Sequence, residues 1–239
     1  MRNPQYVKWM VHCMDLTSLN ENDNLEIIKE LCKLAETIHG HVAAVCVYPQ
    51  FVSTAKSSLK QASIPVATVS NFPQGNQNLE DTLIEIQKAL REGADEIDIV
   101  LPYEKFLTGS ERFCFDYLRE CRANIPTHLV LKVILETGEL KDPALIRAAS
   151  ELAIEAGADF IKTSTGKTPI GATLEAAEIM LDAIQNQNRK VGLKISGGIR
   201  SYDQAADYCR LVESKMGVDW ISSLHFRIGA SSLLKDLLE

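Results

Sequence analysis

The feature that most constrains the fold of this chain is a repeat in which short apolar runs alternate with longer stretches of helical periodicity. The short runs are rich in β-branched residues, as buried strands are, and the longer stretches place apolar residues three and four positions apart. Eight runs are predicted to be strands: Val11 to Leu16, Ala43 to Val47, Val66 to Ser70, Glu96 to Val100, Leu129 to Leu135, Phe160 to Thr163, Gly192 to Ile195 and Trp220 to Ser223. Helices are predicted between them, including Leu25 to Thr37, Leu79 to Glu92, Ala144 to Ala156 and Thr173 to Ala183.

Alternating strands and helices form either an open doubly wound sheet or a closed barrel. The count of eight favours the barrel, and no G-x-G-x-x-G motif follows the first predicted strand to indicate a dinucleotide site. Hydrophobic residues make up 46% of the 239 residues, which is ample for one core, and no linker interrupts the repeat. We therefore predict an α/β protein with a single-domain (β/α)₈ TIM barrel spanning residues 1–239.

Charge and composition exclude several classes of function. The formal net charge of −7 argues against a broad nucleic-acid-binding surface, which would need clustered Lys and Arg. The six cysteines include no C-x-x-C pair and the five histidines no metal-ligand spacing, so we expect reduced thiols, no metal and no cofactor. No segment resembles a cleaved leader or a membrane span, and we expect a cytoplasmic protein without a membrane partner.

Charged residues interrupt five of the predicted strands. In a barrel of this kind the active site forms at the carboxyl ends of the strands, so charged residues near those ends are candidates for function. Burying an ammonium group among apolar residues costs several kcal/mol unless it is paired, so strand lysines need an explanation. The candidates are Asp15, Asp98, Lys132, Lys162 and Lys194.

The three strand lysines suggest two roles. Some of them could point outward, or form structural ion pairs inside the barrel with Asp98, Asp15 and Glu136. Alternatively, one lysine is a nucleophile that forms a Schiff base, which requires a pKa below its usual value so that the amine is neutral. Lys194 lies one strand from Lys162, and a second cation so close would lower the pKa of Lys162. Asp98 could then transfer protons during imine formation.

Two segments near the end of the sequence are typical of phosphate loops. A phosphate site formed by the loops after strands seven and eight recurs in this fold, because small residues let backbone N–H groups approach an anion. The segments SGGIR and RIGASSLL fit that description, and Lys167 could add a positive charge. The predicted phosphate-binding residues are Lys167, Gly197, Gly198, Gly229, Ser231 and Ser232.

In chain order, these segments and several others resemble the deoxyribose-phosphate aldolases of the bacterial type. The similar runs span Asp15 to Leu234, and the most specific are FIKTSTGK, LKVILETGELKD and GASSLL. The others are MDLT, VCVYPQFV, VSNFPQGN, ADEIDIVLPY and LKISGGIR. The resemblance implies a class I aldolase with a (β/α)₈ fold that reversibly cleaves 2-deoxy-D-ribose 5-phosphate to D-glyceraldehyde 3-phosphate and acetaldehyde in deoxyribonucleoside catabolism.

The resemblance also assigns roles to individual residues. It implies that Lys162 is the Schiff-base lysine, rather than Lys167, that Asp98 relays protons and that Lys194 perturbs Lys162. Asp15 and Lys132 match supporting residues of the family's active site. The resemblance places five of the predicted phosphate-binding residues where the family holds the substrate phosphate: Lys167, Gly197, Gly198, Ser231 and Ser232.

Two departures from the family pattern lead to further expectations. Ile195 and Ser196 replace a Pro-Ala pair found in many members, which is expected to alter turn geometry without moving the lysine or the glycines. Some members also end in a tyrosine-bearing tail, whereas this sequence ends at Glu239, so slower turnover is expected.

Other functions remain open at this stage. They are a barrel lyase or isomerase acting on another phosphorylated sugar, and a non-catalytic barrel that binds a phosphorylated metabolite. A homodimer is a further expectation, because barrels of this size often pair.

Overall fold

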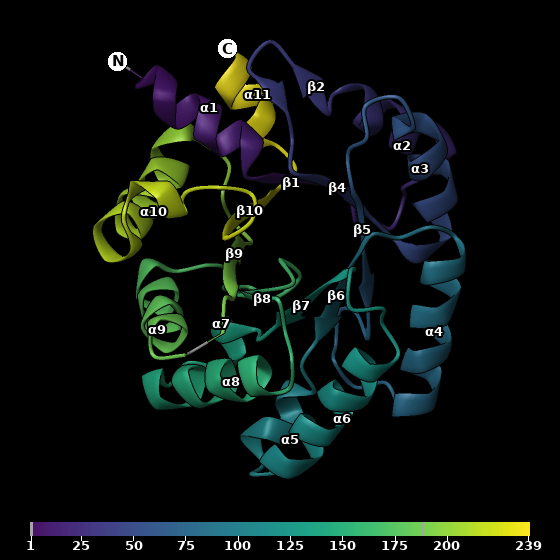
Figure 1. The fold of residues 1–239 in the computed structure, drawn as a ribbon, viewed down its shortest axis with the longest axis vertical. Coiled ribbons are helices and arrows are strands. Elements are labelled where there is room, and N and C mark those ends of the chain that lie inside the picture. Colours follow the sequence, from purple (N-terminus) through teal and green to yellow (C-terminus); the bar gives the residue numbers. More distant parts are fainter. Residues whose placement is uncertain (1, 188) are drawn as a thin grey trace.

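The computed structural model of this chain describes residues 2–187 and 189–239. Eight parallel strands form a closed barrel, in the spatial order β1, β10, β9, β8, β7, β6, β5, β4 and back to β1. Helices surround the strands as a ring (Figure 1). The predicted (β/α)₈ TIM barrel is therefore confirmed. The barrel strands are β1 (Met14–Thr17), β4 (Ala44–Val47), β5 (Val66–Ser70), β6 (Glu96–Val100), β7 (Val130–Ile134), β8 (Phe160–Lys162), β9 (Gly192–Ser196) and β10 (Phe226–Ala230).

The helices follow the apolar periodicity of the sequence. They are α1 (Pro4–His12), α2 (Leu25–Lys33), α3 (Val52–Leu59), α4 (Leu79–Arg91), α5 (Tyr103–Leu107), α6 (Glu111–Ala123), α7 (Thr137–Leu140), α8 (Pro143–Glu155), α9 (Leu174–Gln185), α10 (Tyr202–Met216) and α11 (Leu233–Leu238). Two 3₁₀ turns, η1 (Pro49–Phe51) and η2 (Val218–Trp220), complete them. The main core lies between the helices and the outer face of the strands.

The first and second units depart from the sequence prediction. Val11 lies in α1, not in a strand, because Val7, Met10 and Val11 form the buried stripe of a helix capped by Asn3. In the second unit the predicted helix ends at Lys33, and a small hairpin of β2 (Glu36–Thr37) and β3 (Gly40–His41) follows it.

The eighth strand was predicted in the wrong place. Trp220 ends η2, and the barrel strand is β10, which begins at Phe226. In β10 the apolar Phe226 and Ile228 alternate with Arg227 and Gly229, so its pattern was not recognised as that of a buried strand. This correction moves Arg227 and Gly229 from a loop into the barrel wall.

The two ends of the chain lie side by side (Figure 1). Arg2 forms an ion pair with Asp236 of α11 at 3.2 Å, and the backbone N–H of Asn3 donates to the hydroxyl of Tyr202. The barrel closes through the pairing of β1 with both β10 and β4. The beginning and the end of the sequence thus complete one sheet.

The barrel interior is divided into an apolar side and a charged side. Strands β4 and β5 contribute the small side chains of Ala44, Cys46, Ala67 and Val69, which pack together. The remaining six strands contribute Asp15, Glu96, Asp98, Lys132, Lys162, Lys194 and Arg227, all of them buried. Small residues on one side leave space for long charged side chains from the other.

Candidate active site

Lys162 ends β8, and strand register places it beside a second lysine. Residues paired in a parallel sheet point to the same face, so the pairing of Lys162 with Lys194 directs both side chains inward. The pairing of Asp98 with Lys132 does the same on β6 and β7. Four of the five charged residues expected near the strand ends therefore meet inside the barrel by register alone.

Asp98 is the centre of this charged cluster. Its Oδ1 accepts from Lys132 Nζ at 2.8 Å, and its Oδ2 accepts from Lys162 Nζ at 2.9 Å and from Lys194 Nζ at 2.7 Å. Burial alone would raise the pKa of this carboxyl, but the three ammonium groups outweigh burial and hold the pKa well below its usual value. Asp98 is therefore a carboxylate at neutral pH.

Asp15 extends the cluster from β1. Its Oδ2 lies 2.6 Å from Lys194 Nζ, and its Oδ1 accepts from Arg227 at 2.6 Å. Burial favours the neutral acid, but Lys194, Arg227 and Lys132 together lower the pKa of Asp15. Asp15 thus also carries a negative charge at neutral pH.

The three lysines differ in how many carboxylates they contact. Lys132 lies 2.5 Å from Glu96, 2.8 Å from Asp98 and 3.7 Å from Asp15, and Lys194 contacts Asp15 and Asp98. Burial favours neutral amines in both, but these carboxylates outweigh it and raise both pKa values. Among the carboxylates of the described residues, Lys162 forms an ion pair with Asp98 alone.

Lys162 is the lysine of the cluster whose pKa is lowered. Burial is the main cause, and the nearby Lys194 cation adds to it, while Asp98 acts in the opposite direction. The cluster sets four cationic side chains against three carboxylates in direct contact, so the positive charges outnumber the negative ones by one. Lys162, with the fewest carboxylate contacts, is the group that loses its proton most readily.

Two further charged residues belong to the cluster and are not among the candidates predicted from the sequence: Glu96 and Arg227. The two guanidinium nitrogens of Arg227 bind Asp15 and Glu96, and the Arg227 guanidinium lies 5.3 Å from the centre of the Phe160 ring. Arg227 was missed because strand eight was misplaced. Glu96 could have been found, since it lies two residues before Asp98 on a strand and so shares its face.

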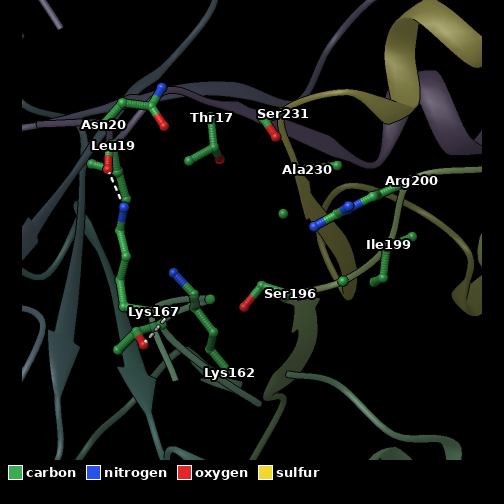
Figure 2. Close-up of a pocket in the computed structure, with 15 residues that line it drawn as sticks. Thr17, Leu19, Asn20, Lys162, Lys167, Ser196, Ile199, Arg200, Ala230 and Ser231 are labelled. Atoms are coloured by element: carbon green, nitrogen blue, oxygen red, sulfur yellow. Dashed lines mark hydrogen bonds between the residues drawn. The ribbon is translucent and has the colours of Figure 1, made fainter. Parts of the chain in front are cut away.

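Above the cluster a pocket of about 190 Å³ opens, and Lys162 projects into it (Figure 2). Arg200 and Ser196 approach the same space from the β9 side, and Thr17 and Asn20 approach it from the β1 side. The lining residues are Thr17, Leu19, Asn20, Lys162, Thr165, Gly166, Lys167, Ser196, Gly197, Gly198, Ile199, Arg200, Gly229, Ala230 and Ser231. The amine of Lys162 is thus accessible from a polar pocket at the carboxyl ends of the strands.

The glycines that follow β9 give the far wall of this pocket a backbone surface. Gly197 and Gly198 have φ angles of +88° and +85°, a backbone conformation that residues with a side chain rarely adopt. A Cβ on Gly197 would lie 2.9 Å from Gly171 Cα, so the two loops can pack this closely only without side chains. In the described part of the chain, the N–H groups of Gly198, Ile199 and Ser231 have no protein acceptor. Free N–H groups at a pocket wall suit an anion.

Most of the predicted phosphate-binding residues line this pocket. Lys167, Gly197, Gly198, Gly229 and Ser231 do so, whereas Ser232 is not among the lining residues. The ammonium of Lys167 donates to the carbonyl of Leu19 (Figure 2). Gly229 lies in β10, where a Cβ would meet Lys194 Cε at 3.1 Å, so it leaves space for that lysine. Arg200, the last residue of the SGGIR segment, also lines the pocket but is not among the predicted phosphate-binding residues.

Glu136 holds the loop that follows Lys162. Its carboxylate accepts from the N–H and the hydroxyl of Thr165 and from the hydroxyl of Thr168. The backbone of Glu136 has a φ of +56°, a strained value for this residue type. Burial is the main reason that its pKa is raised. This residue thus connects the end of β7 to the pocket loop after β8.

Asn71, another strand-end residue, has its side chain occupied elsewhere. It donates to the carbonyl of Val100 and accepts from the N–H of Gln77. Within the described residues, no group of three or more His, Cys, Asp or Glu side chains is arranged to hold a metal ion. In the same part of the chain, no helix is both long and apolar enough to cross a membrane.

Comparison with known proteins identifies the family. Residues 9–238 match the model of the DeoC/LacD family aldolases. The chain belongs to this aldolase family. The resemblance inferred from the sequence motifs is thus confirmed, and the protein is a carbon–carbon lyase. The match extends over almost the entire barrel, including all the charged residues of the cluster.

Solved structures of related proteins agree with this assignment. A candidate deoxyribose-phosphate aldolase from Toxoplasma gondii ME49 is 26% identical, with a TM-score of 0.89 over 98% of this chain and 93% of that chain. The tetrameric deoxyribose phosphate aldolase from Aeropyrum pernix is 25% identical, with a TM-score of 0.80 over 97% of this chain and 91% of that one. The aldolase QR15 is 32% identical, with a TM-score of 0.80 over 96% of each chain.

Proposed function

We propose that this aldolase forms a Schiff base through Lys162 and reversibly cleaves 2-deoxy-D-ribose 5-phosphate to D-glyceraldehyde 3-phosphate and acetaldehyde. The observation that carries the proposal is the position of Lys162. Its amine faces a polar pocket, and it is the lysine of a buried cluster with the fewest carboxylate contacts. Burial and the Lys194 cation lower the pKa of this amine, which increases the fraction of neutral amine that can attack an aldehyde.

The reaction begins at the aldehyde carbon, C1, of the open-chain sugar phosphate. The lone pair of Lys162 Nζ attacks C1, and the resulting carbinolamine loses water to give a protonated imine. Asp98, whose Oδ2 lies 2.9 Å from Lys162 Nζ, is the nearest carboxylate and accepts and returns protons during these steps. The positive imine nitrogen then withdraws electrons from the neighbouring carbon.

Cleavage follows when the 3-hydroxyl loses its proton. The electron pair of the C2–C3 bond moves toward the imine, a C3 carbonyl forms, and D-glyceraldehyde 3-phosphate leaves. The remaining enamine takes up a proton at C2, and hydrolysis of the new imine releases acetaldehyde and regenerates Lys162. Reversal of the same steps joins the two aldehydes, and no cofactor takes part in either direction.

The wall opposite Lys162 is suited to the substrate phosphate. The free N–H groups of Gly198, Ile199 and Ser231 lie there, and Arg200 and Lys167 line the same pocket. Charge-assisted hydrogen bonds from such donors hold a phosphate in place. Lys194, Asp15 and Lys132 lie below the pocket and maintain the charge balance around Lys162.

An assay of product release tests the proposal. The protein is incubated with 2-deoxy-D-ribose 5-phosphate or with 2-deoxy-D-ribose, and D-glyceraldehyde 3-phosphate or glyceraldehyde is quantified. We expect a much higher kcat/KM for the phosphorylated sugar. Arg200→Gln should raise the KM for 2-deoxy-D-ribose 5-phosphate by about tenfold and leave the KM for 2-deoxy-D-ribose unchanged. Arg210→Gln is the control, because Arg210 pairs with Asp207 on α10. No release of either product would contradict the proposal.

A further inference from the structure

Arg227 is a buried cation below the lysines, and its guanidinium is held on several sides. Only 6% of the residue is exposed. Its Nε donates to the carbonyl of Ser223 at 2.5 Å, one terminal nitrogen donates to Asp15 and the other to Glu96. A planar group with this many fixed partners has one orientation. Arg227 therefore fixes the two carboxylates that it contacts.

Those carboxylates hold the two other charged lysines. Asp15 turns Oδ1 to Arg227 and Oδ2 to Lys194. Glu96 Oε1 accepts from Arg227 at 2.9 Å, and its Oε2 accepts from Lys132 at 2.5 Å and from Arg227 at 3.2 Å. Both carboxylates are thus shared between Arg227 and the lysines, since Asp15 also lies 3.7 Å from Lys132, and neither forms an ion pair with Lys162 among the described residues. Asp15 and Glu96 thus form ion pairs with Lys132, Lys194 and Arg227, whereas Lys162 has Asp98 as its one carboxylate contact among the described residues.

We propose that Arg227, braced by Glu96, is a positioning residue that keeps Lys162 as the unmatched cation of the barrel interior and thereby sets the pH range in which its amine reacts. The inference rests on the proposed Schiff base at Lys162. Arg227 does not line the substrate pocket, so it acts through Asp15 and Glu96.

Titratable side chains face this region from nearly every strand. Strands β4 and β5 contribute mainly small apolar residues, with a buried thiol on β4. The facing groups are Cys13 and Asp15 before and on β1, Cys46 on β4, Glu96 and Asp98 on β6, Lys132 on β7, Glu136 after β7, Lys162 on β8, Lys194 on β9 and Arg227 on β10. Burial raises the pKa of both thiols, so they are uncharged at neutral pH.

Two substitutions with opposite effects on charge test the inference. Arg227→Met removes a positive charge and keeps much of the volume, so the Lys162 ammonium meets less repulsion and its pKa rises. Glu96→Gln keeps the shape but removes a negative charge, so the pKa of Lys162 falls further. The measurement is the rate at which acetaldehyde is trapped on Lys162 by cyanoborohydride, followed from pH 5 to 10 by mass spectrometry.

The expected result is a pair of shifts in opposite directions. The midpoint of the pH profile should move up by about one pH unit in Arg227→Met, and the trapping rate near neutral pH should fall about tenfold and recover in alkali. In Glu96→Gln the midpoint should move down by about half a pH unit. If Arg227→Met does not fold, the direction of the Glu96→Gln shift decides.

The role of Arg227 would be overturned if both variants kept the wild-type midpoint of the pH profile and their trapping rates fell equally at every pH. A wild-type midpoint in Glu96→Gln alone would also overturn it. Failure of the proposed function gives a different result, because the wild-type protein itself would then form no adduct on Lys162. The two failures are therefore distinguishable in the same experiment.

Discussion

At the scale of single residues, the site depends on an unequal distribution of carboxylates among buried lysines. Lys132 and Lys194 each contact two or more, and Lys162 contacts one. A buried ammonium without enough partners costs free energy in the folded state. The residue proposed as the nucleophile should therefore be one that weakens the fold.

This leads to a prediction about stability. The pKa of Lys162 is lower in the folded chain than in the unfolded one. At a pH below the usual lysine pKa, Lys162 therefore binds a proton more readily in the unfolded state, and this lowers the free energy of unfolding. Lys162→Met should therefore raise the free energy of unfolding at pH 7 by about 1–3 kcal/mol. Lys194→Met is the matched control and should lower the free energy of unfolding by about 3 kcal/mol, because it leaves Asp15 and Asp98 short of a partner. Urea denaturation at pH 7 measures both.

Equal losses of stability in the two methionine variants would contradict the prediction that Lys162 weakens the fold. Such a result would mean that Lys162 is a satisfied member of a structural ion network. That was the alternative left open by the sequence, in which strand lysines pair with neighbouring carboxylates.

At this scale the sequence predicts the three lysines and two of their carboxylate partners, Asp15 and Asp98, but neither Glu96 nor Arg227. Lys132, Lys162 and Lys194 stand out because each interrupts an apolar strand. Arg227 does not, because it stands in a segment whose glycine and serines suggest a loop. Arg200 and the Lys167 contact with Leu19 depend on how loops from distant strands meet, which no local pattern encodes. The individual roles of the predicted site residues remain predictions.

At the scale of elements, the loops after β8 and β9 pack in close backbone contact at the glycine-rich wall of the pocket. Gly171 and Gly197 lie so close that a Cβ on Gly197 would be 2.9 Å from Gly171 Cα. A Cβ on Gly198 would meet no atom within 4 Å. The two adjacent glycines thus share a positive φ but differ in their surroundings.

The pair allows conformational strain to be separated from crowding. Gly198→Ala should cost about 1–2 kcal/mol of stability from the positive φ alone. Gly197→Ala adds an overpacked contact and should cost about 1–3 kcal/mol more. It should also raise KM for the phosphorylated sugar more strongly, because the loops must separate. Thermal unfolding and steady-state kinetics measure these effects, and equal losses in the two variants would contradict the packing argument.

Element boundaries were predicted best where the pattern was regular. Predicted Leu79 to Glu92 differs from α4 by one residue at its end, and predicted Ala144 to Ala156 differs from α8 by one residue at each end. Strand eight was misplaced because Arg227 and Gly229 occupy its inward positions, where apolar residues are the usual signal. The two residues at the inward positions of this strand are those that obscure it in the sequence.

At the scale of the whole molecule, the barrel interior links all the strands. Charged groups from six strands meet below the pocket, and β1 closes the sheet against both β10 and β4. Separate unfolding of one part would break this closure and leave buried charges unpaired. We therefore propose that residues 1–239 form a single domain, as the uninterrupted repeat predicts. A homodimer and a cytoplasmic location remain predictions.

Calorimetry at a series of pH values tests this view. One unfolding transition is expected at neutral pH. Asp15 and Asp98 have lowered pKa values in the folded protein, so their contribution to stability is complete above the usual Asp pKa of about 3.9 and is lost as the pH falls below it. The Tm should therefore fall steeply below about pH 4. Two resolved transitions at pH 7, or a Tm that does not change down to pH 3, would contradict this account.

The central claim is that Lys162 forms the Schiff base, and its most direct test is chemical trapping. The protein is incubated with 2-deoxy-D-ribose 5-phosphate or acetaldehyde, reduced with borohydride, digested and analysed by peptide mass mapping. The account predicts one reduced adduct, on Lys162 in the peptide that contains FIKTSTGK, and its loss in Lys162→Met. An adduct on Lys167 instead, or no adduct while the sugar phosphate is still cleaved, would contradict it.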